Sequence, residues 1–117
     1  MRVYIAGAMS SKNPVTFLDN LRKGMRLSTR VLLAGHSVFS PFIDFQLFFM
    51  TQEDEEITAA QIKASSMAWL GVSEAVVLVY GWQDSQGTKD EIAEAERLGI
   101  PVYDSLAALE YANHKGE

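Results

Sequence analysis

One stretch of this sequence joins three structural signals in order: Ala75-Val76-Val77-Leu78-Val79-Tyr80-Gly81-Trp82-Gln83-Asp84-Ser85-Gln86-Gly87-Thr88-Lys89-Asp90-Glu91. Its first six residues form an apolar run that predicts a central buried strand, and the Gly, Ser and Asp residues that follow predict a loop. A helical pattern begins at Thr88 and ends at Gly99. A strand, a loop and a helix N-terminus in that order direct backbone N–H groups and a positive dipole end towards one point. The stretch therefore predicts a βα unit with a ligand site at its loop.

Glu91 departs from the pattern of the predicted helix. It falls in the first turn and shares a face with Ala95 and Leu98, which is the face expected to pack on the sheet. One reading is that its carboxylate caps loop N–H groups or complements the helix dipole. The other reading is that the carboxylate points into a cleft and takes part in chemistry.

Length and composition limit the class of protein. A chain of 117 residues is expected to form one domain, spanning residues 1–117. No apolar run approaches the length of a membrane span, and Met1 and Arg2 lead directly into a strand-like run instead of a signal peptide. We therefore expect a cytoplasmic protein with no membrane partner.

Cysteine is absent, so disulfides and thiolate metal sites are excluded. His36 and His114 are the imidazoles of the sequence, and neither lies in a metal-binding spacing. We expect no cofactor, although a metal held by oxygen ligands alone stays open. The net charge of −5 argues against a surface for duplex nucleic acid, which would need clustered Lys and Arg.

Short apolar runs alternate with helical patterns along the whole chain, which is typical of α/β proteins. The predicted strands are residues 3–6, 37–40, 75–80 and 100–103. The predicted helices are residues 14–34, 53–70, 88–98 and 106–112, the second of which starts with the acidic run 53–56. Right-handed crossovers then give a flavodoxin-like or Rossmann-like three-layer sandwich with four or five parallel strands.

Three polar loops are expected to meet at the carboxyl ends of these strands, where ligands of such sheets lie. They are residues 7–11, 40–44 and 81–91. The candidate substrate contacts in these loops are Gly7, Met9, Ser40, Pro41, Asp44, Gly81, Trp82, Asp84, Ser85 and Gly87.

The same elements resemble the nucleoside 2-deoxyribosyltransferase superfamily, and in particular its small stand-alone members, most of which are uncharacterised. The resemblance rests on Val3-Tyr4-Ile5-Ala6-Gly7, Gly35-His36-Ser37-Val38-Phe39-Ser40-Pro41, the stretch from Gly81 to Glu91, and Gly99-Ile100-Pro101-Val102. It extends over nearly the whole chain, and the stretch ending at Glu91 is its most specific part. A looser similarity links Gly87-Thr88-Lys89-Asp90-Glu91 to other nucleotide-handling domains with a Gly-Thr-x-x-Glu turn.

The resemblance implies cleavage or transfer at the N-glycosidic bond of a nucleoside or nucleotide. Glu91 would be the nucleophile at the sugar C1′, kept ionised by the helix N-terminus, and Tyr4 would position it. Asp84 and Ser85 would bind sugar hydroxyls. Without the resemblance, Tyr4 reads as a core aromatic residue, and the other two read as turn residues.

Ser66 stands where the superfamily commonly places an aspartate that assists the leaving base. A serine cannot act as a general acid near neutral pH. Either Asp44 or one of the acidic residues Glu53, Asp54 and Glu55 would have to substitute, unless that acidic run is only a helix start. The alternative function is a catalytically silent module that binds or senses nucleotides.

The segment 42–50 contains four Phe residues, more than a small core readily absorbs. Members of the superfamily are homo-oligomers whose neighbouring subunits complete each active site, so we expect this segment to lie in a subunit contact. Base stacking by one of these rings, or by Trp82, is the second reading. A purely structural oligomeric domain is a further alternative, which the meeting of three polar loops disfavours.

Overall fold

The computed structural model describes residues 1–115, built around a four-stranded parallel sheet in the order β2-β1-β3-β4. The strands are β1 (Arg2–Ala6), β2 (Ser37–Phe39), β3 (Ala75–Leu78) and β4 (Val102–Tyr103). The helices are α1 (Pro14–Leu33), α2 (Ala59–Gly71), α3 (Gln86–Arg97) and α4 (Leu106–Lys115), with 3₁₀ helices η1 (Pro41–Met50) and η2 (Trp82–Asp84). The predicted α/β class and parallel sheet are confirmed.

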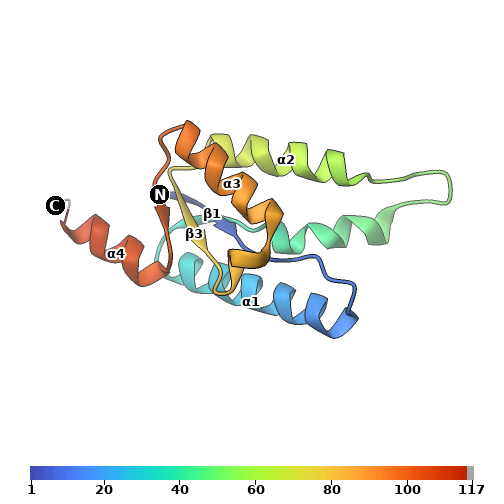
Figure 1. Ribbon diagram of the computed structural model, residues 1–117, viewed down its shortest axis with the longest axis horizontal. Coiled ribbons are helices and arrows are strands. Elements are labelled where there is room, and N and C mark those ends of the chain that lie inside the picture. Colours follow the sequence, from blue (N-terminus) through green and yellow to red (C-terminus); the bar gives the residue numbers. More distant parts are fainter. Residues whose placement is uncertain (116–117) are drawn as a thin grey trace.

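Helices cover both faces of the sheet, α1 and α4 on one and α2 and α3 on the other (Figure 1). Successive residues of a strand point to opposite faces, so the two cores take alternate residues of β1. Val3 and Ile5 pack with α1 and α4, whereas Tyr4 and Ala6 pack with α2 and α3. The result is the three-layer sandwich expected from the sequence.

The aromatic segment after β2 forms η1, whose three residues per turn sort its side chains into rows. Phe42 is 1% exposed and belongs to the core, so its predicted place in a subunit contact is wrong. Its ring lies against α1 at Gly24, where an added Cβ would come within 2.2 Å of Phe42 Cγ. Phe48 and Phe49, in contrast, stay exposed. The missing side chain of Gly24 is therefore what admits one ring of this segment to the core.

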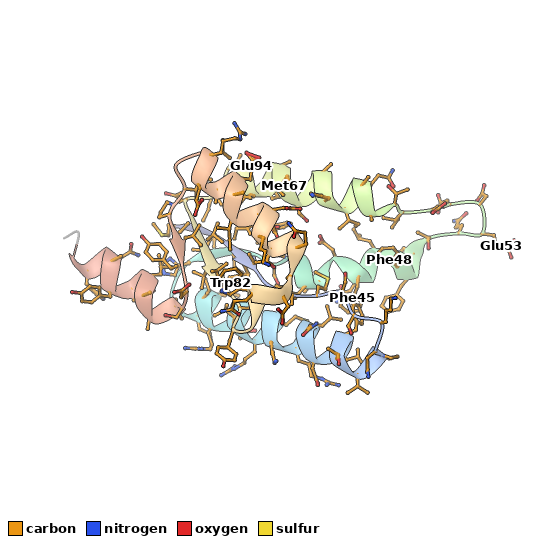
Figure 2. All side chains as sticks on the ribbon, viewed as in Figure 1. Phe45, Phe48, Glu53, Met67, Trp82 and Glu94 are labelled. Carbon is orange, nitrogen blue, oxygen red and sulfur yellow. The ribbon has the colours of Figure 1, made fainter. Side chains whose placement is uncertain are left out.

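The acidic run 53–56 does not start a helix, which corrects the sequence prediction. Helix α2 begins at Ala59, because Thr58 and Gln61 form a reciprocal capping box. The acidic residues lie in the loop that joins η1 to α2. Glu53 lies at the far tip of that loop, well away from the sheet (Figure 2).

Helix α3 begins two residues earlier than predicted, at Gln86, because the Ser85 side chain accepts a hydrogen bond from the Thr88 N–H and caps the helix. Glu91 consequently lies in the second turn instead of the first. The field of the helix N-terminus falls off within the first turn, so it acts on Glu91 more weakly than the sequence suggested.

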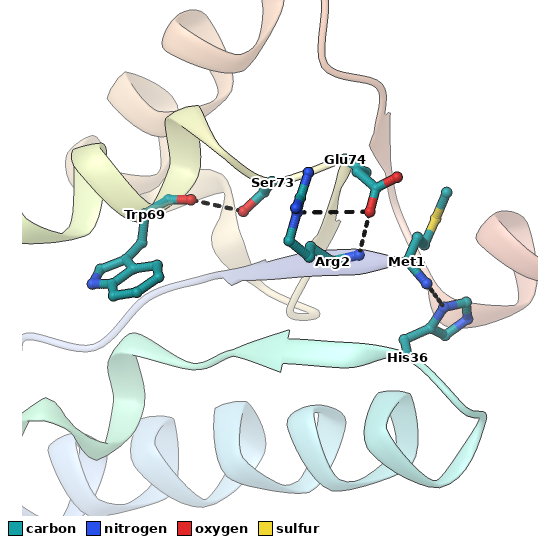
Figure 3. Close-up of polar contacts among 6 residues, drawn as sticks. All are labelled: Met1, Arg2, His36, Trp69, Ser73 and Glu74. Carbon is teal, nitrogen blue, oxygen red and sulfur yellow. Dashed lines mark hydrogen bonds and ion pairs between the residues drawn. The ribbon is translucent and has the colours of Figure 1, made fainter.

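Polar contacts fix the amino ends of the strands (Figure 3). The Arg2 N–H donates to Glu74 Oε1 at 2.9 Å, and the Glu74 N–H donates to the Arg2 carbonyl at 2.8 Å. The Met1 amino group lies 3.3 Å from His36 Nδ1. These contacts occupy one end of the sheet, whereas the carboxyl ends of the strands lead into loops. Among the described residues, no helix combines the length and the apolar character needed to cross a membrane.

Candidate active site

A cleft of about 1010 Å³ lies at the carboxyl ends of β1 and β3. Its walls come from α2, α3, η1 and the start of α1, and its volume is at the upper end of ordinary small-molecule sites. Most of the predicted site residues line it, namely Tyr4, Gly7, Met9, Pro41, Asp44, Gly81, Asp84, Ser85, Gly87 and Glu91. Three loops far apart in the sequence therefore meet around one space.

Two predicted contacts, Ser40 and Trp82, are not among the residues that line this cleft. Ser40 is buried, and its hydroxyl is hydrogen-bonded to Ser28 Oγ at 2.8 Å. Trp82 packs against the core between the sheet and the helices α2 and α3. Ser40 links the start of η1 to α1 through its hydrogen bond with Ser28, and Trp82 contributes to hydrophobic packing.

Glu91 and Tyr4 lie next to each other on the inner wall of the cleft. Burial raises the pKa of Glu91 to about 7, although the neighbouring Tyr4 hydroxyl acts in the opposite direction. Burial and the Glu91 carboxyl together raise the pKa of Tyr4, which keeps its hydroxyl protonated. Burial therefore opposes the ionisation of Glu91 that was expected from the helix N-terminus.

An ion pair between Lys63 and Asp90 joins α2 to α3 beside Glu91. Lys63 Nζ lies 2.8 Å from Asp90 Oδ2, and the Gln86 side chain donates to Asp90 Oδ1 at 2.9 Å. The hydrogen bond from Lys63 lowers the pKa of Asp90 and keeps that carboxylate ionised. On Glu91, the charges of Asp90 and Lys63 oppose each other, so this pair does not cancel the effect of burial.

Asp44 supplies a second partly buried carboxyl to the cleft. Burial raises its pKa, and within residues 1–115 the carboxyl forms no hydrogen bond or ion pair. Ser66 is also buried in the cleft, where its hydroxyl is another polar neighbour of Tyr4. The other acidic candidates, Glu53 to Glu55, are exposed and do not line the cleft.

Sequence reasoning missed Asn20 and Lys63 as cleft residues. Asn20 donates to the Met9 carbonyl at 3.2 Å and so holds the loop after β1. The sequence pattern could have predicted Asn20 as a cleft residue. It lies between Phe17 and Gly24 on the inward face of α1, where a polar side chain is unusual. No sequence pattern indicates Lys63, because its pairing with Asp90 depends on α3 lying beside α2.

Ionisable side chains on the lining of the cleft are Tyr4, Asp44, Lys63, Asp84 and Glu91. No group of three His, Asp or Glu side chains within the described chain is arranged to hold a metal ion. Lys63 is already paired with Asp90. The site thus combines two partly buried carboxyls with a protonated phenol, which is a set suited to acid–base and nucleophilic chemistry.

Comparison with known protein families gives a match over residues 1–104 to the family described as "Domain of unknown function (DUF4406)". The chain belongs to this family. A search of the curated proteins gives no match.

Comparison with solved structures finds the fold in the 2-deoxyribosyltransferase of the psychrotolerant bacterium Bacillus psychrosaccharolyticus. The TM-score is 0.60, and the match covers 87% of this chain and 69% of that chain at 18% sequence identity. The structural superposition shows a shared fold, and at this low sequence identity it shows the fold alone. The fold relationship expected from the sequence is therefore confirmed.

Proposed function

We propose that this protein cleaves or exchanges the N-glycosidic bond of a nucleoside or nucleotide, with Glu91 as the nucleophile. The proposal rests on one observation above all, the partly buried Glu91 carboxyl beside the protonated Tyr4 hydroxyl in a cleft at the carboxyl edge of the sheet. The fold shared with a 2-deoxyribosyltransferase supports it.

In this mechanism, Glu91 loses its proton and its carboxylate attacks C1′ of the sugar as the base departs. Positive charge develops on the sugar ring, and the carboxylate stabilises that charge before it forms a covalent bond. Tyr4 keeps its proton, so its hydroxyl donates a hydrogen bond that orients the attacking carboxylate. Water then releases the sugar, or a second base accepts it.

The test is release of free base from a panel of ribonucleosides, deoxyribonucleosides and their 5′-monophosphates, followed by chromatography. Glu91→Gln keeps the shape of the side chain but removes the anion, so turnover is expected to fall by three or more orders of magnitude. Glu96→Gln is the matched control, since Glu96 is an exposed residue of the same helix that does not line the cleft. Full turnover in Glu91→Gln would exclude the proposal.

A covalent intermediate gives a second readout. A 2-fluoro-sugar substrate slows the release step of retaining glycosidases, so mass spectrometry of the intact protein should show one added sugar in the wild type and none in Glu91→Gln. Adding a second free base distinguishes the two outcomes of the reaction. A new nucleoside indicates transfer, and free sugar alone indicates hydrolysis.

The second candidate is a module that binds nucleotides without turnover, and Ser66 favours it because a hydroxyl replaces the expected acid in the cleft. Thermal stabilisation of the wild type by one compound of the panel, with no base released from it, would select this candidate.

A further inference from the structure

We propose that Asp44 is the proton donor to the departing base, so that the acid of this site comes from η1 instead of α2. This inference rests on the proposed function and assigns a role that Ser66 cannot perform. Among the described residues, Asp44, Asp84 and Glu91 are the carboxyls that line the cleft. Glu91 is needed as the nucleophile, and Asp84 is exposed on η2, so Asp44 is the partly buried carboxyl that remains.

Partial burial without a hydrogen bond or ion pair sets Asp44 apart from the exposed and from the paired acidic residues of the described chain. Asp90 is paired with Lys63, Glu94 with Arg97, and Glu74 with Arg2. Asp44, in contrast, forms no hydrogen bond or ion pair within residues 1–115. A partly buried carboxyl without a protein partner favours the protonated form, which is the form that a general acid requires.

The apolar residues beside Asp44 suit a base. Phe45 and Phe48 of η1 and Ile62 of α2 line the same cleft. Aromatic and aliphatic walls accommodate a planar heterocycle, whereas the polar residues Asp84 and Ser85 lie on the loop that leads to α3. The proposal therefore places the base towards η1 and the sugar towards Glu91, with Asp44 on the side of the base.

The bond between C1′ and the base nitrogen breaks while a Glu91 oxygen bonds to C1′, and the electron pair of the broken bond stays with the base. The carboxyl proton of Asp44 moves to the base, which leaves neutral, and Asp44 becomes a carboxylate. Water or a second base then attacks C1′ and gives its proton to Asp44, and the bond to Glu91 breaks with its electron pair returning to Glu91.

Leaving groups that need no proton provide the test. An N7-methylated purine nucleoside releases a neutral base without an acid, and a 5-nitrouracil nucleoside is the corresponding probe for a pyrimidine-specific enzyme. Asp44→Asn should lower kcat/KM about 10²- to 10⁴-fold for the ordinary nucleoside. The loss for its activated counterpart should be less than about 10-fold, because protonation of the leaving group is all that the variant lacks.

Matched variants separate this role from others. Asp54→Asn changes an exposed carboxyl outside the cleft and should leave both rates unchanged. Glu91→Gln should abolish turnover of both substrates, and Asp44→Glu should recover part of the rate on the ordinary nucleoside. Circular dichroism of Asp44→Asn checks that the variant folds.

The pH profile gives an independent readout. Turnover of the ordinary nucleoside needs Glu91 ionised and Asp44 protonated, so its rate should fall on the acidic side, where Glu91 with its pKa of about 7 takes up a proton, and on the alkaline side, where Asp44 loses its proton. The activated nucleoside needs only ionised Glu91 and should reach a plateau instead. Tyr4 from β1, Lys63 from α2 and Asp90 from α3 also face this pair, and each keeps one charge state across this range.

An equal loss on both substrates in Asp44→Asn, or no loss on either, would overturn the assignment of Asp44 while leaving the proposed function intact. Absence of base release by the wild type from every nucleoside and nucleotide would instead overturn the proposed function and this inference with it.

Discussion

The buried hydroxyl of Tyr4 faces the Glu91 carboxyl, yet it has no partner within hydrogen-bonding geometry in the described chain. An unpaired buried hydroxyl and a partly buried carboxyl both cost folding free energy. Such costs persist at sites where a ligand makes the missing contacts. We therefore expect Tyr4 and Glu91 to lower the free energy of unfolding while they support activity. Substitutions of Glu91 and Tyr4 separate the effect on stability from the effect on activity.

Glu91→Gln should stabilise the protein in alkaline solution. Burial raises the pKa of Glu91 from 4.5 to about 7, so the folded protein keeps a proton that the unfolded chain loses between these values. The free energy of unfolding therefore falls as pH rises from about 4.5 to 7, by roughly 3–4 kcal/mol at about 1.4 kcal/mol per unit. The neutral glutamine should remove this penalty, with a gain of that size at pH 8 and little change at pH 4.

Urea denaturation at both pH values measures the effect, with Glu96→Gln as the exposed control on α3. If Glu91 only capped its helix, the glutamine variant would be less stable than the wild type at pH 8 by about 1 kcal/mol. That result would contradict the burial of charge described above.

Tyr4→Phe should separate stability from activity. It removes a buried hydroxyl that has no partner, so the free energy of unfolding should stay constant or rise by up to about 1–2 kcal/mol. If the hydroxyl orients Glu91 during the reaction, kcat/KM should fall by the equivalent of about 1–3 kcal/mol. Denaturation and base release on the same preparation provide both numbers. A loss of stability above 1 kcal/mol would show that the hydroxyl supports the fold.

Local patterns were sufficient to predict the sheet and the position of the cleft. The apolar run that contains β3, the loop after it and the phase of Glu91 on its helix are properties of neighbouring residues, which periodicity captures. Parallel strands place their following loops at one edge, so the meeting of Gly7, Pro41 and Gly81 followed from the topology.

What the sequence left open depends on contacts between distant segments. The burial of Phe42 depends on the missing side chain of Gly24 in α1, and the pairing of Lys63 with Asp90 depends on two helices lying side by side. The acidic run 53–56 suggested a helix start, but the capping box at Thr58 provides a better one. Whether a carboxyl such as Asp44 reaches the cleft also depends on the path of η1, which has no clear periodic signal.

Gly24→Ala should destabilise the protein, contrary to the usual effect of this substitution in a helix. Alanine normally stabilises a helix interior by up to about 1 kcal/mol relative to glycine. Here an added Cβ would lie 2.2 Å from Phe42 Cγ, so the ring must move and the core be repacked. We expect a net loss of about 1–3 kcal/mol, measured by thermal or urea denaturation.

Gly71→Ala is the matched control at the end of α2, where the nearest side-chain atom, in Leu98, would lie at 4.0 Å. It should be neutral or stabilising. A Gly24→Ala variant as stable as this control would show that Phe42 is not packed against α1.

The exposed end of η1 should form a contact between two copies of this chain. Leu47, Phe48, Phe49 and Met50 are 55%, 47%, 76% and 79% exposed, and these four successive residues give the end of η1 an exposed apolar surface. Such a surface is costly in water and typical of an interface. Light scattering at micromolar concentration should therefore give the mass of a homo-oligomer. A monomer at that concentration would contradict the prediction.

Substitution of Phe49 and Met50 together by Ser should shift the protein towards the monomer, because these are the most exposed residues of the surface. Leu33→Ser is the control, since Leu33 is 78% exposed at the end of α1 and lies outside the surface. Phe48 lines both this surface and the cleft, so a second copy seated here would border the site. Dissociation should then weaken substrate binding in the double variant, seen as a raised KM, while Leu33→Ser keeps the wild-type value. An unchanged mass for the double variant would place the subunit contact on another face.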